Sequence, residues 1–550
     1  MAGSSSNKNK APVHDLERQI GELHLALAER DAIIAEHTTT IAEQNEALQA
    51  ANRYLETLKR MLFGPKSERV AEPAAGQGLL FNEAEADSSS VEAVDAKTPE
   101  LVKRTKAAHS GRRRPAGEFK RVEIIHELAE EDSACPWCNC QRPKIGEERS
   151  EEYEVIPAQL IVKVHVRVKY GPCQCDDFAG HDEKAIVTAP GPVRIAPGSL
   201  YSNSVAALVI VNKFCDGLPL YRQEAWFARL GLELARSTMA RLVIRVATAL
   251  SPLIDCLKRD IRGSPVLGMD ETEVQVLKED GRPPSAPSRM WIARGFTADE
   301  AAKPFVWFAY HDSRSGDVAE ALVGSGFSGF LQTDGYAGYN RLGKRPGIVH
   351  VGCWAHIRRK FHEQYVSAKA TPLAEQALDH IRRLYTIERR WRSQLRDSLV
   401  TRDEFVAGRR AEVEPVFDEF LNWLQGSYKT VPERGGLGLA ISYALGQFRR
   451  AVRYVDHWLL TPDNNAVENA IRPFVIGRNN WQFMDTPAGA RASACLYSLI
   501  ETAKANGHEP YSYLCHLFST LPLVADNPAA VSQLLPYRLD PRSYKTAPTG

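Results

Sequence analysis

The stretch "PVLGMDETEVQVL", residues 265–277, has the alternation of a β-strand but carries a carboxylate among its valines. Successive side chains of a strand point to opposite faces, so Asp270 shares a face with Val266 and Val274, while Glu271 points the other way. An unpaired carboxylate on a buried face is costly or takes up a proton. The sequence therefore requires a partner for Asp270, and the neighbouring segments indicate which one.

The segments after this strand keep its two-residue period. "RMWIARGFT" (289–297) and "KPFVWFAYHD" (303–312) predict two more strands, and the short connections imply antiparallel pairing. "SGDVAEALVGSG" (315–326) predicts a short helix that ends at glycine. The sequence thus predicts three strands and a helix in succession.

A fourth strand, within "GFLQTDGYAGYN" (329–340), is predicted to end at Asp334, and "GIVHVGCWAHIRRKFHEQY" (347–365) predicts a fifth strand followed by a helix. Three strands, a helix and a further strand are the order of a ribonuclease-H-like core. We therefore expect such a domain over residues 263–500, with a helical insertion over about 361–458.

Three acidic residues can meet in this arrangement. Asp270 lies within the first strand, Asp334 ends the fourth, and Glu468 opens a helix predicted to begin near Asn464. Like charges held together raise each other's pKa unless a cation lies between them. Two Mg²⁺ ions (or Mn²⁺) would supply that charge and activate a water or a 3′-hydroxyl for attack at phosphorus. We predict that the three carboxylates are catalytic residues and metal ligands.

Each carboxylate also has a structural interpretation. Asp270 can pair with an arginine of the helical insertion, and Asp334 can begin a turn at Gly335. Asn465-x-x-Glu468 has the spacing of a capping box. Only the joint placement of the three residues on the predicted strand order favours catalysis.

Basic and aromatic residues near the predicted site are candidates for binding DNA phosphates or stacking on an unpaired base. These candidates are His356, Arg358, Arg359, Arg472, Arg478 and Trp481. Surface ion pairs and, for the tryptophan, core packing are the structural alternatives. A separate basic run, "KRTKAAHSGRRRP", contains Arg112, Arg113 and Arg114 and is either a phosphate-binding arm or a solvated linker.

Two cysteine pairs indicate a structural zinc site over residues 121–190. Cys135-Pro-Trp-Cys138 and Cys173-Gln-Cys175 flank an alternating, hairpin-like segment, so each pair can place two thiolates on one Zn²⁺ ion. The alternative is a set of reduced thiols without metal, and the second pair has the less usual spacing.

Residues 15–65 predict a coiled coil, because an apolar residue recurs every seven positions from Ile20 to Leu62. A single amphipathic helix folded onto its own protein is the alternative. Residues 66–120 then form a flexible linker with the basic arm. Residues 195–262 are helical and suit either a helix-turn-helix-like DNA-binding region or an ordinary helical hairpin.

The whole chain is therefore predicted to be a multidomain α+β protein, completed by a C-terminal helical segment and tail over 501–550. The net charge is only +1, so any affinity for nucleic acid must come from local asymmetry. The first residues lack the apolar core of a signal peptide, and no apolar run is long enough to span a membrane. We expect a cytoplasmic, nucleoid-associated protein.

Seven blocks, in order along nearly the whole chain, resemble transposases of the insertion sequence 66 family, large C-type subunit. The blocks are "LFGPKSER", "CPWC", "GMDET", "LQTDGYAGY", "GCWAHIRRKF", "NNAVENAIRPFVIGRNNW" and "SLIETAKANGHEPYSYL". The resemblance implies a DDE-class transposase whose triad is Asp270, Asp334 and Glu468. It also implies a zinc-binding domain at Cys135 and Cys138, although the family's second pair is usually CxxC, and small accessory proteins from the same element.

The predicted function is that of a bacterial DNA transposase, which cuts transposon ends and joins the freed 3′-OH ends to target DNA. Its partners would be double-stranded DNA and a second copy, or more, of this chain, paired through the coiled coil. Two rival functions stay open: a non-catalytic zinc and helix-turn-helix regulator, and a ribonuclease-H-like nuclease that cuts without joining.

Overall fold

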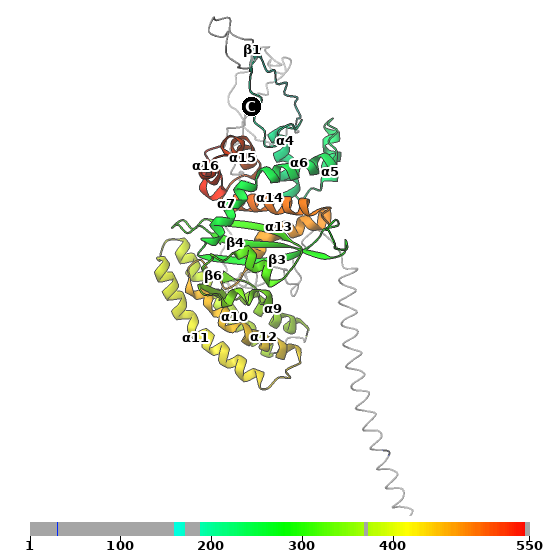
Figure 1. Ribbon diagram of the computed structural model, residues 1–550. Coiled ribbons are helices and arrows are strands. Elements are labelled where there is room, and N and C mark those ends of the chain that lie inside the picture. The colour runs from blue at the N-terminus through cyan, green and yellow to red at the C-terminus, as the bar shows by residue number, and fades with distance from the viewer. Residues whose placement is uncertain (1–29, 31–158, 171–186, 368–371, 545–550) are drawn as a thin grey trace, which may run out of the picture. The chain divides into compact units, whose positions relative to one another are not determined.

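The computed structural model describes residues 30, 159–170, 187–367 and 372–544. The chain divides into two compact units, residues 1–78 and 79–550, and nearly all of the first lies outside the described residues. Apart from residue 30, the predicted coiled coil also lies outside the described residues. So do the linker with Arg112, Arg113 and Arg114, and the predicted zinc ligands Cys135, Cys138, Cys173 and Cys175. Apart from residue 30, all the described residues lie in the second unit (Figure 1).

A five-stranded mixed sheet is built from the strands that the sequence predicted. The strands are β3 (Val266–Gln275), β4 (Pro287–Phe296), β5 (Pro304–His311), β6 (Gly329–Gln332) and β7 (Ile348–Val351). Their order in the sheet is β5-β4-β3-β6-β7. The pairs β3–β4 and β4–β5 are antiparallel, whereas β3–β6 and β6–β7 are parallel. The predicted short helix, α8 (Gly316–Val323), lies between β5 and β6 in the chain.

Strand β3 departs from the expected alternation in its first half, because Val266 to Met269 are all buried. Both faces are covered there: Leu267 and Met269 belong to one hydrophobic cluster, whereas Val266 belongs to another, formed mainly by the helical insertion. Strand β6 ends two residues before Asp334, so that residue lies in the loop after the strand rather than at its last position.

Among the described residues, four helices precede the sheet in the chain: α4 (Asn203–Phe214), α5 (Leu220–Arg229), α6 (Arg236–Ala249) and α7 (Ser251–Arg262). The Ser202 hydroxyl accepts a hydrogen bond from the Val205 N–H and caps the start of α4. Gly231 follows α5 with φ +82°, a conformation that glycine adopts without strain. The helical content of the predicted DNA-binding region is therefore present, and its contact with DNA stays a prediction.

Helix α14 (Pro487–Ala505) packs along β5, an edge strand of the sheet. The side chains of Ser498 and Thr502 accept hydrogen bonds from the N–H groups of Phe308 and Val306, at 2.8 and 2.9 Å. They satisfy backbone donors that an edge strand would otherwise leave open. The elements that complete this end of the chain are α15 (Pro510–Val524), α16 (Pro528–Gln533) and η6 (Pro536–Arg538).

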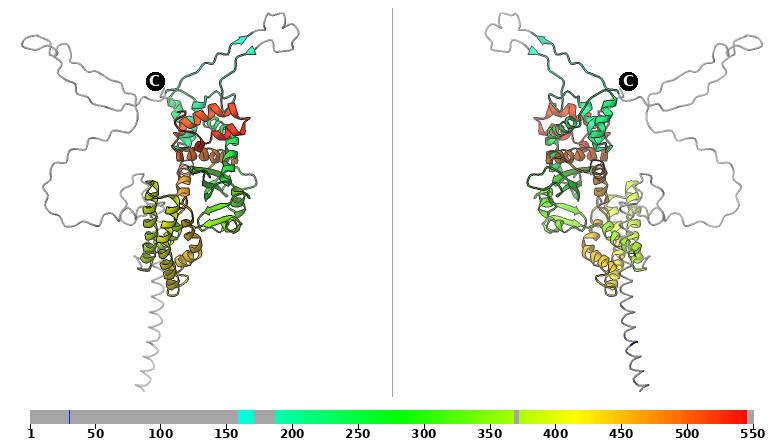
Figure 2. Two further views of the ribbon diagram at one scale, coloured as in Figure 1. Left: turned by 90° about the vertical axis from the view of Figure 1, so that its left-hand side faces the viewer. Right: turned by 90° about the vertical axis from the view of Figure 1, so that its right-hand side faces the viewer.

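The predicted helical insertion consists of long helices (Figure 2). Their aliphatic and aromatic side chains form most of the second hydrophobic cluster. Its elements are α9 (Trp354–Ser367), α10 (Pro372–Arg396), α11 (Arg402–Tyr428), α12 (Gly436–Ala451) and η5 (Val452–Asp456). Arg409 of α11 is 0% exposed. It donates to Glu388 of α10 and to the backbone carbonyls of Tyr454, His457 and Leu460. One buried guanidinium thus ties two insertion helices to the segment that leads into α13 (Asn465–Trp481).

The remaining described elements are short: β1 (Lys169–Tyr170) pairs antiparallel with β2 (Val187–Thr188), and η3 (Ala337–Tyr339) and η4 (Leu342–Lys344) follow β6. In the described part of the chain, no helix combines the length and the apolar character needed to cross a membrane.

Candidate active site

The parallel pairing of β3 with β6 brings the two predicted aspartates to the same level of the sheet. Gly268 is paired with Gln332, and continuing this register by two residues aligns Asp270 with Asp334. The prediction that the first and fourth strands are neighbours is confirmed. Both aspartates are partly buried.

Helix α13 brings Glu468 to this place from a distant part of the sequence. Glu468 lies in the first turn of the helix and is 6% exposed. A Cβ at Gly268 would lie 2.5 Å from Val467 Cγ2 and 2.9 Å from the Asn464 side-chain oxygen, so only glycine lets the start of α13 approach β3 this closely.

Strand β3 holds both ends of α13. At the start of the helix, the Asn464 side-chain amide donates to the Met269 carbonyl at 2.9 Å. Beyond its end, the Met484 N–H donates to the Gln275 carbonyl at 2.9 Å, and Val276 forms a parallel β-bridge with Met484. The position of Glu468 is therefore fixed by the strand that carries Asp270.

The capping-box interpretation of Asn465 and Glu468 is wrong. The N-cap of α13 is Asn464, no side-chain capping bond is formed there, and Asn465 already lies inside the helix. The turn interpretation of Asp334 is correct in geometry, because its Oδ1 accepts a hydrogen bond from the Tyr336 N–H at 2.9 Å. Making this turn leaves the second carboxylate oxygen of Asp334 available for another role.

Asp270 lies among negative charges. Burial, followed by the neighbouring carboxylate of Glu271, raises the pKa of Asp270 well above its usual range, and Asp334 and Glu468 act in the same direction. A hydrogen bond from the Glu271 N–H, at 2.8 Å, opposes this shift. Among the described residues no arginine or lysine forms an ion pair with Asp270, which excludes the predicted structural alternative within that part of the chain.

The adjacent carboxylate, Glu271, is compensated. Its side chain is 3% exposed and accepts hydrogen bonds from Arg314 Nε and the Tyr339 hydroxyl, each at 2.6 Å. The two consecutive acidic residues of β3 therefore differ in kind: Glu271 has structural partners, and Asp270 faces other carboxylates.

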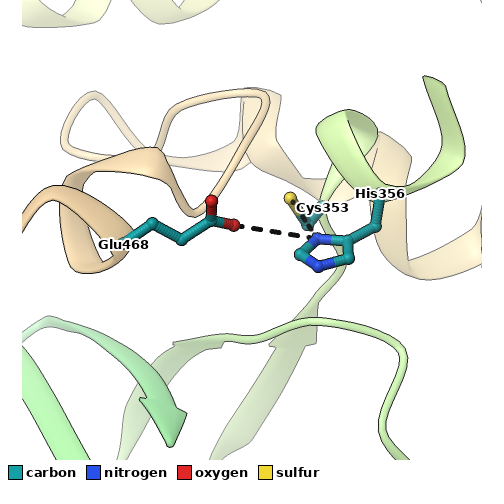
Figure 3. A group of neighbouring side chains, drawn as sticks. All are labelled: Cys353, His356 and Glu468. Carbon is teal, nitrogen blue, oxygen red and sulfur yellow. Dashed lines mark hydrogen bonds and ion pairs between the residues drawn. The ribbon is translucent and has the colours of Figure 1, made fainter. Parts of the chain in front are cut away.

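Three potential metal ligands converge at Glu468: Cys353, His356 and Glu468 itself have ligand atoms that all lie within 4.8 Å of one another (Figure 3). His356 Nδ1 lies 3.3 Å from Cys353 Sγ and 3.9 Å from Glu468 Oε1. In the part of the chain that the structure describes, the three predicted carboxylates do not form so tight a group. Burial lowers the pKa of His356, and burial raises the pKa of the Cys353 thiol.

Sequence reasoning missed Cys353 and assigned His356 to DNA phosphates. The available signal was the Cys-x-x-His spacing in "GCWAHIRRKF", which places a thiol just before a helix and an imidazole in its first turn. Only the fold could show that both face Glu468.

The other predicted DNA-binding residues differ in exposure and in the contacts that they make. Arg359 and Arg472 are exposed, whereas Arg358 is buried. Arg478 is partly buried and donates to the Thr272 hydroxyl and the Glu273 carbonyl of β3. Trp481 packs in an aromatic cluster with Phe474 and Tyr497, and the Lys213 ammonium lies 4.1 Å from its ring centre. Arg478 and Trp481 thus have structural contacts in addition to their predicted role.

Four family models match parts of this chain. The model described as "Transposase IS66 family" matches residues 198–492, and "IS66 C-terminal element" matches 498–537. "Zinc-finger binding domain of transposase IS66" matches residues 132–176, which include all four predicted zinc ligands. "Transposase C of IS166 homeodomain" matches residues 52–124.

The chain is also similar to proteins of Sinorhizobium fredii. It is 30% identical to the uncharacterized protein y4jD over 428 residues, which cover 76% of this chain and 80% of the relative. It is 29% identical to the uncharacterized protein y4qI over 500 residues, 88% of each chain.

Proposed function

The chain belongs to the IS66 transposase family, and from that premise we propose that it is a DNA transposase of a bacterial insertion sequence that cuts element ends and joins their 3′-OH groups to target DNA. The observation that supports the proposal most is that Asp270 of β3, Asp334 of the loop after β6 and Glu468 at the start of α13 are close enough for the two other carboxylates to raise the pKa of Asp270. The strand order, three antiparallel strands followed by two parallel ones, supports a ribonuclease-H-like core.

The three carboxylates would hold two Mg²⁺ or Mn²⁺ ions. The donors fit such ions: they are hard oxygens, Asp270 has no ion-pair partner in the described part of the chain, and the buried Oε1 of Glu468 has no hydrogen-bond partner there. When bound, the ions would activate a water or a 3′-hydroxyl and stabilise the leaving oxygen of an in-line displacement at phosphorus.

Residues of the chain itself would orient the DNA. Arg472 lies one helical turn after Glu468 on α13, so the two side chains share a face of the helix, and Arg472 is exposed. Arg359 is exposed on α9, three residues after His356. We assign both guanidinium groups to the scissile strand, where they would hold phosphate oxygens and neutralise charge.

Other parts of the chain would serve assembly. The coiled coil predicted over residues 15–65 would pair protomers so that two element ends are held together, and the zinc-binding domain would be structural. The helix-turn-helix-like region and the basic arm would bind double-stranded DNA, with small accessory proteins of the same element as further partners. A protein acting on chromosomal DNA would be found with the nucleoid in the cytoplasm.

A strand-transfer assay on element ends with Mg²⁺ or Mn²⁺ tests the proposal. The Asp270→Asn variant is expected to lose cleavage and joining while retaining DNA binding, because it removes one metal ligand and little else. Asp299→Asn, in an exposed turn between β4 and β5, is the matched control and should keep activity. Full activity of Asp270→Asn would contradict the assignment. Binding without cleavage by the unaltered chain would favour the regulator, and cleavage without joining would favour the nuclease.

A further inference from the structure

Cys353 and His356 contribute donors beside Glu468 that the proposed transposase chemistry does not use. Cys353 lies between β7 and α9, and His356 lies in the first turn of α9. Glu468 arrives from α13, more than a hundred residues later in the chain. In Figure 3 the sulfur and the carboxylate both face the same ring nitrogen of His356.

The spacing of the three donor atoms suits a single tetrahedral ion. With bonds of about 2.3 Å to sulfur and about 2.0–2.1 Å to nitrogen and oxygen, such an ion holds sulfur about 3.5–3.6 Å from nitrogen, and nitrogen about 3.3–3.4 Å from oxygen. The 3.3 Å from His356 Nδ1 to Cys353 Sγ is shorter than the first of these spacings, and the 3.9 Å from Nδ1 to Glu468 Oε1 is longer than the second. Small rotations of the side chains would therefore complete the site.

Two further observations indicate that these three side chains are arranged to bind a ligand. The Oε1 atom of Glu468 is buried and has no hydrogen-bond partner among the described residues, although a buried carboxylate oxygen normally has one. The backbone N–H of Asn464 points at Cys353 Sγ from 3.3 Å. Hydrogen bonds of this kind orient a metal ligand and stabilise its negative charge.

We propose that Cys353, His356 and Glu468 bind a thiophilic divalent cation of the zinc class, at a site adjacent to the proposed magnesium ligands. A thiolate and an imidazole select such an ion over Mg²⁺, which prefers oxygen ligands throughout. On binding, the Cys353 thiol releases its proton to solvent and the sulfur takes the negative charge. Three donors from the chain leave a fourth position for a water molecule.

Glu468 belongs to both donor sets. A carboxylate shared by two ions binds each of them less strongly than it would bind one alone. A zinc-class ion at Cys353 and His356 therefore competes with the hard cations for Glu468. This competition rests on the proposed function, whereas the binding of the thiophilic ion does not.

Titration of the full chain with Co²⁺, after removal of bound metal with a chelator, tests the site. Cobalt bound to thiolate has a charge-transfer absorption that magnesium lacks, and the assay needs neither DNA nor activity. The unaltered chain is expected to bind one more equivalent of Co²⁺ than Cys353→Ser. Cys495→Ser, which alters a partly buried thiol in α14, is the matched control and should bind as the unaltered chain does.

Equal stoichiometry and equal spectra for Cys353→Ser and the unaltered chain would overturn the proposal, because all thiolate binding would then come from other cysteines. Should Cys353→Ser fail to fold, His356→Gln keeps the thiol and is expected to weaken the same equivalent at least about tenfold. Unchanged affinity in His356→Gln would also overturn it. A Co²⁺ equivalent that is lost in Cys353→Ser, in a chain without strand-transfer activity, would support this site and contradict the proposed function alone.

Discussion

At the scale of single residues, Asp270 and Glu271 show how two adjacent carboxylates can have opposite effects on stability. Glu271 is paired with Arg314 and Tyr339, whereas Asp270 is surrounded by Glu271, Asp334 and Glu468. Without metal, Asp270→Asn is therefore expected to raise the free energy of unfolding by about 1–3 kcal/mol, because it removes an uncompensated buried charge.

Glu271→Gln is the matched comparison and is expected to lower the free energy of unfolding by about 1–3 kcal/mol, since Arg314 and Tyr339 lose a charged acceptor. Urea unfolding of both variants in the presence of a chelator measures the two effects. Destabilisation by Asp270→Asn under these conditions would show that Asp270 has a structural partner after all.

From single residues, a site residue could be predicted only where a charged side chain stands on a face of a strand that is otherwise apolar. Asp270 stood out because a charge interrupted a valine face. Cys353 gave no such conflict, since a buried cysteine before a helix is ordinary in a hydrophobic core. Its significance depends on Glu468, which approaches through tertiary packing that no local pattern encodes.

At the scale of elements, the contact of α13 with β3 positions the site, and it depends on Gly268. Gly268→Ala would force its new methyl against Val467 and Asn464, so the start of α13 must move away from the strand. We expect a loss of about 1–3 kcal/mol in the free energy of unfolding. Strand transfer should fall with it, because Glu468 moves with the helix.

Gly446→Ala, within α12, provides the control. A Cβ there meets no atom within 4 Å, so alanine is expected to stabilise the helix by about 0.5–1 kcal/mol. Thermal unfolding of the two variants, followed by circular dichroism, gives the comparison. Equal stability of Gly268→Ala and the unaltered chain would mean that α13 does not need this close approach.

The strands and the short helix α8 were predictable because period-two alternation and glycine punctuation are local signals. The burial of both faces of β3 was not, since α13 lies against Gly268 and Val266 packs in the cluster formed mainly by the insertion helices, and both come much later in the chain. The supposed capping box of α13 failed for a similar reason: the Asn464 side chain, which would cap an isolated helix, is bonded to Met269 of β3 instead.

At the scale of the whole molecule, Arg409 connects the helical insertion to the segment before α13, the helix that carries Glu468. Its guanidinium donates to Glu388 and to three backbone carbonyls, one within η5 and two between η5 and α13. Arg409→Met removes one donor from each of these carbonyls and leaves Glu388 with Arg392 alone, although Arg392 still donates to the Leu460 carbonyl and the Leu460 N–H to the His457 carbonyl. We expect a loss of about 2–4 kcal/mol in the free energy of unfolding.

The neighbouring Arg410 offers a matched test of that expectation. It pairs with Asp456 at 2.6 Å in an exposed position, so Arg410→Met should cost less than about 1 kcal/mol. Urea unfolding followed by tryptophan fluorescence compares the two variants. Similar small losses for both would mean that the buried network adds little to the attachment of the insertion.

Because β3 contacts both ends of α13, Glu468 can reach Asp270 only after α13 has been synthesised. At roughly 5–20 residues per second, α13 leaves the ribosome on the order of 10–40 s after the strand that carries Asp270. Until then β3 lacks α13, and the nascent chain presents two of its three carboxylates. Under the proposed function, a transposase still being translated is therefore inert, and a gene truncated before this helix encodes a protein that cannot cut DNA.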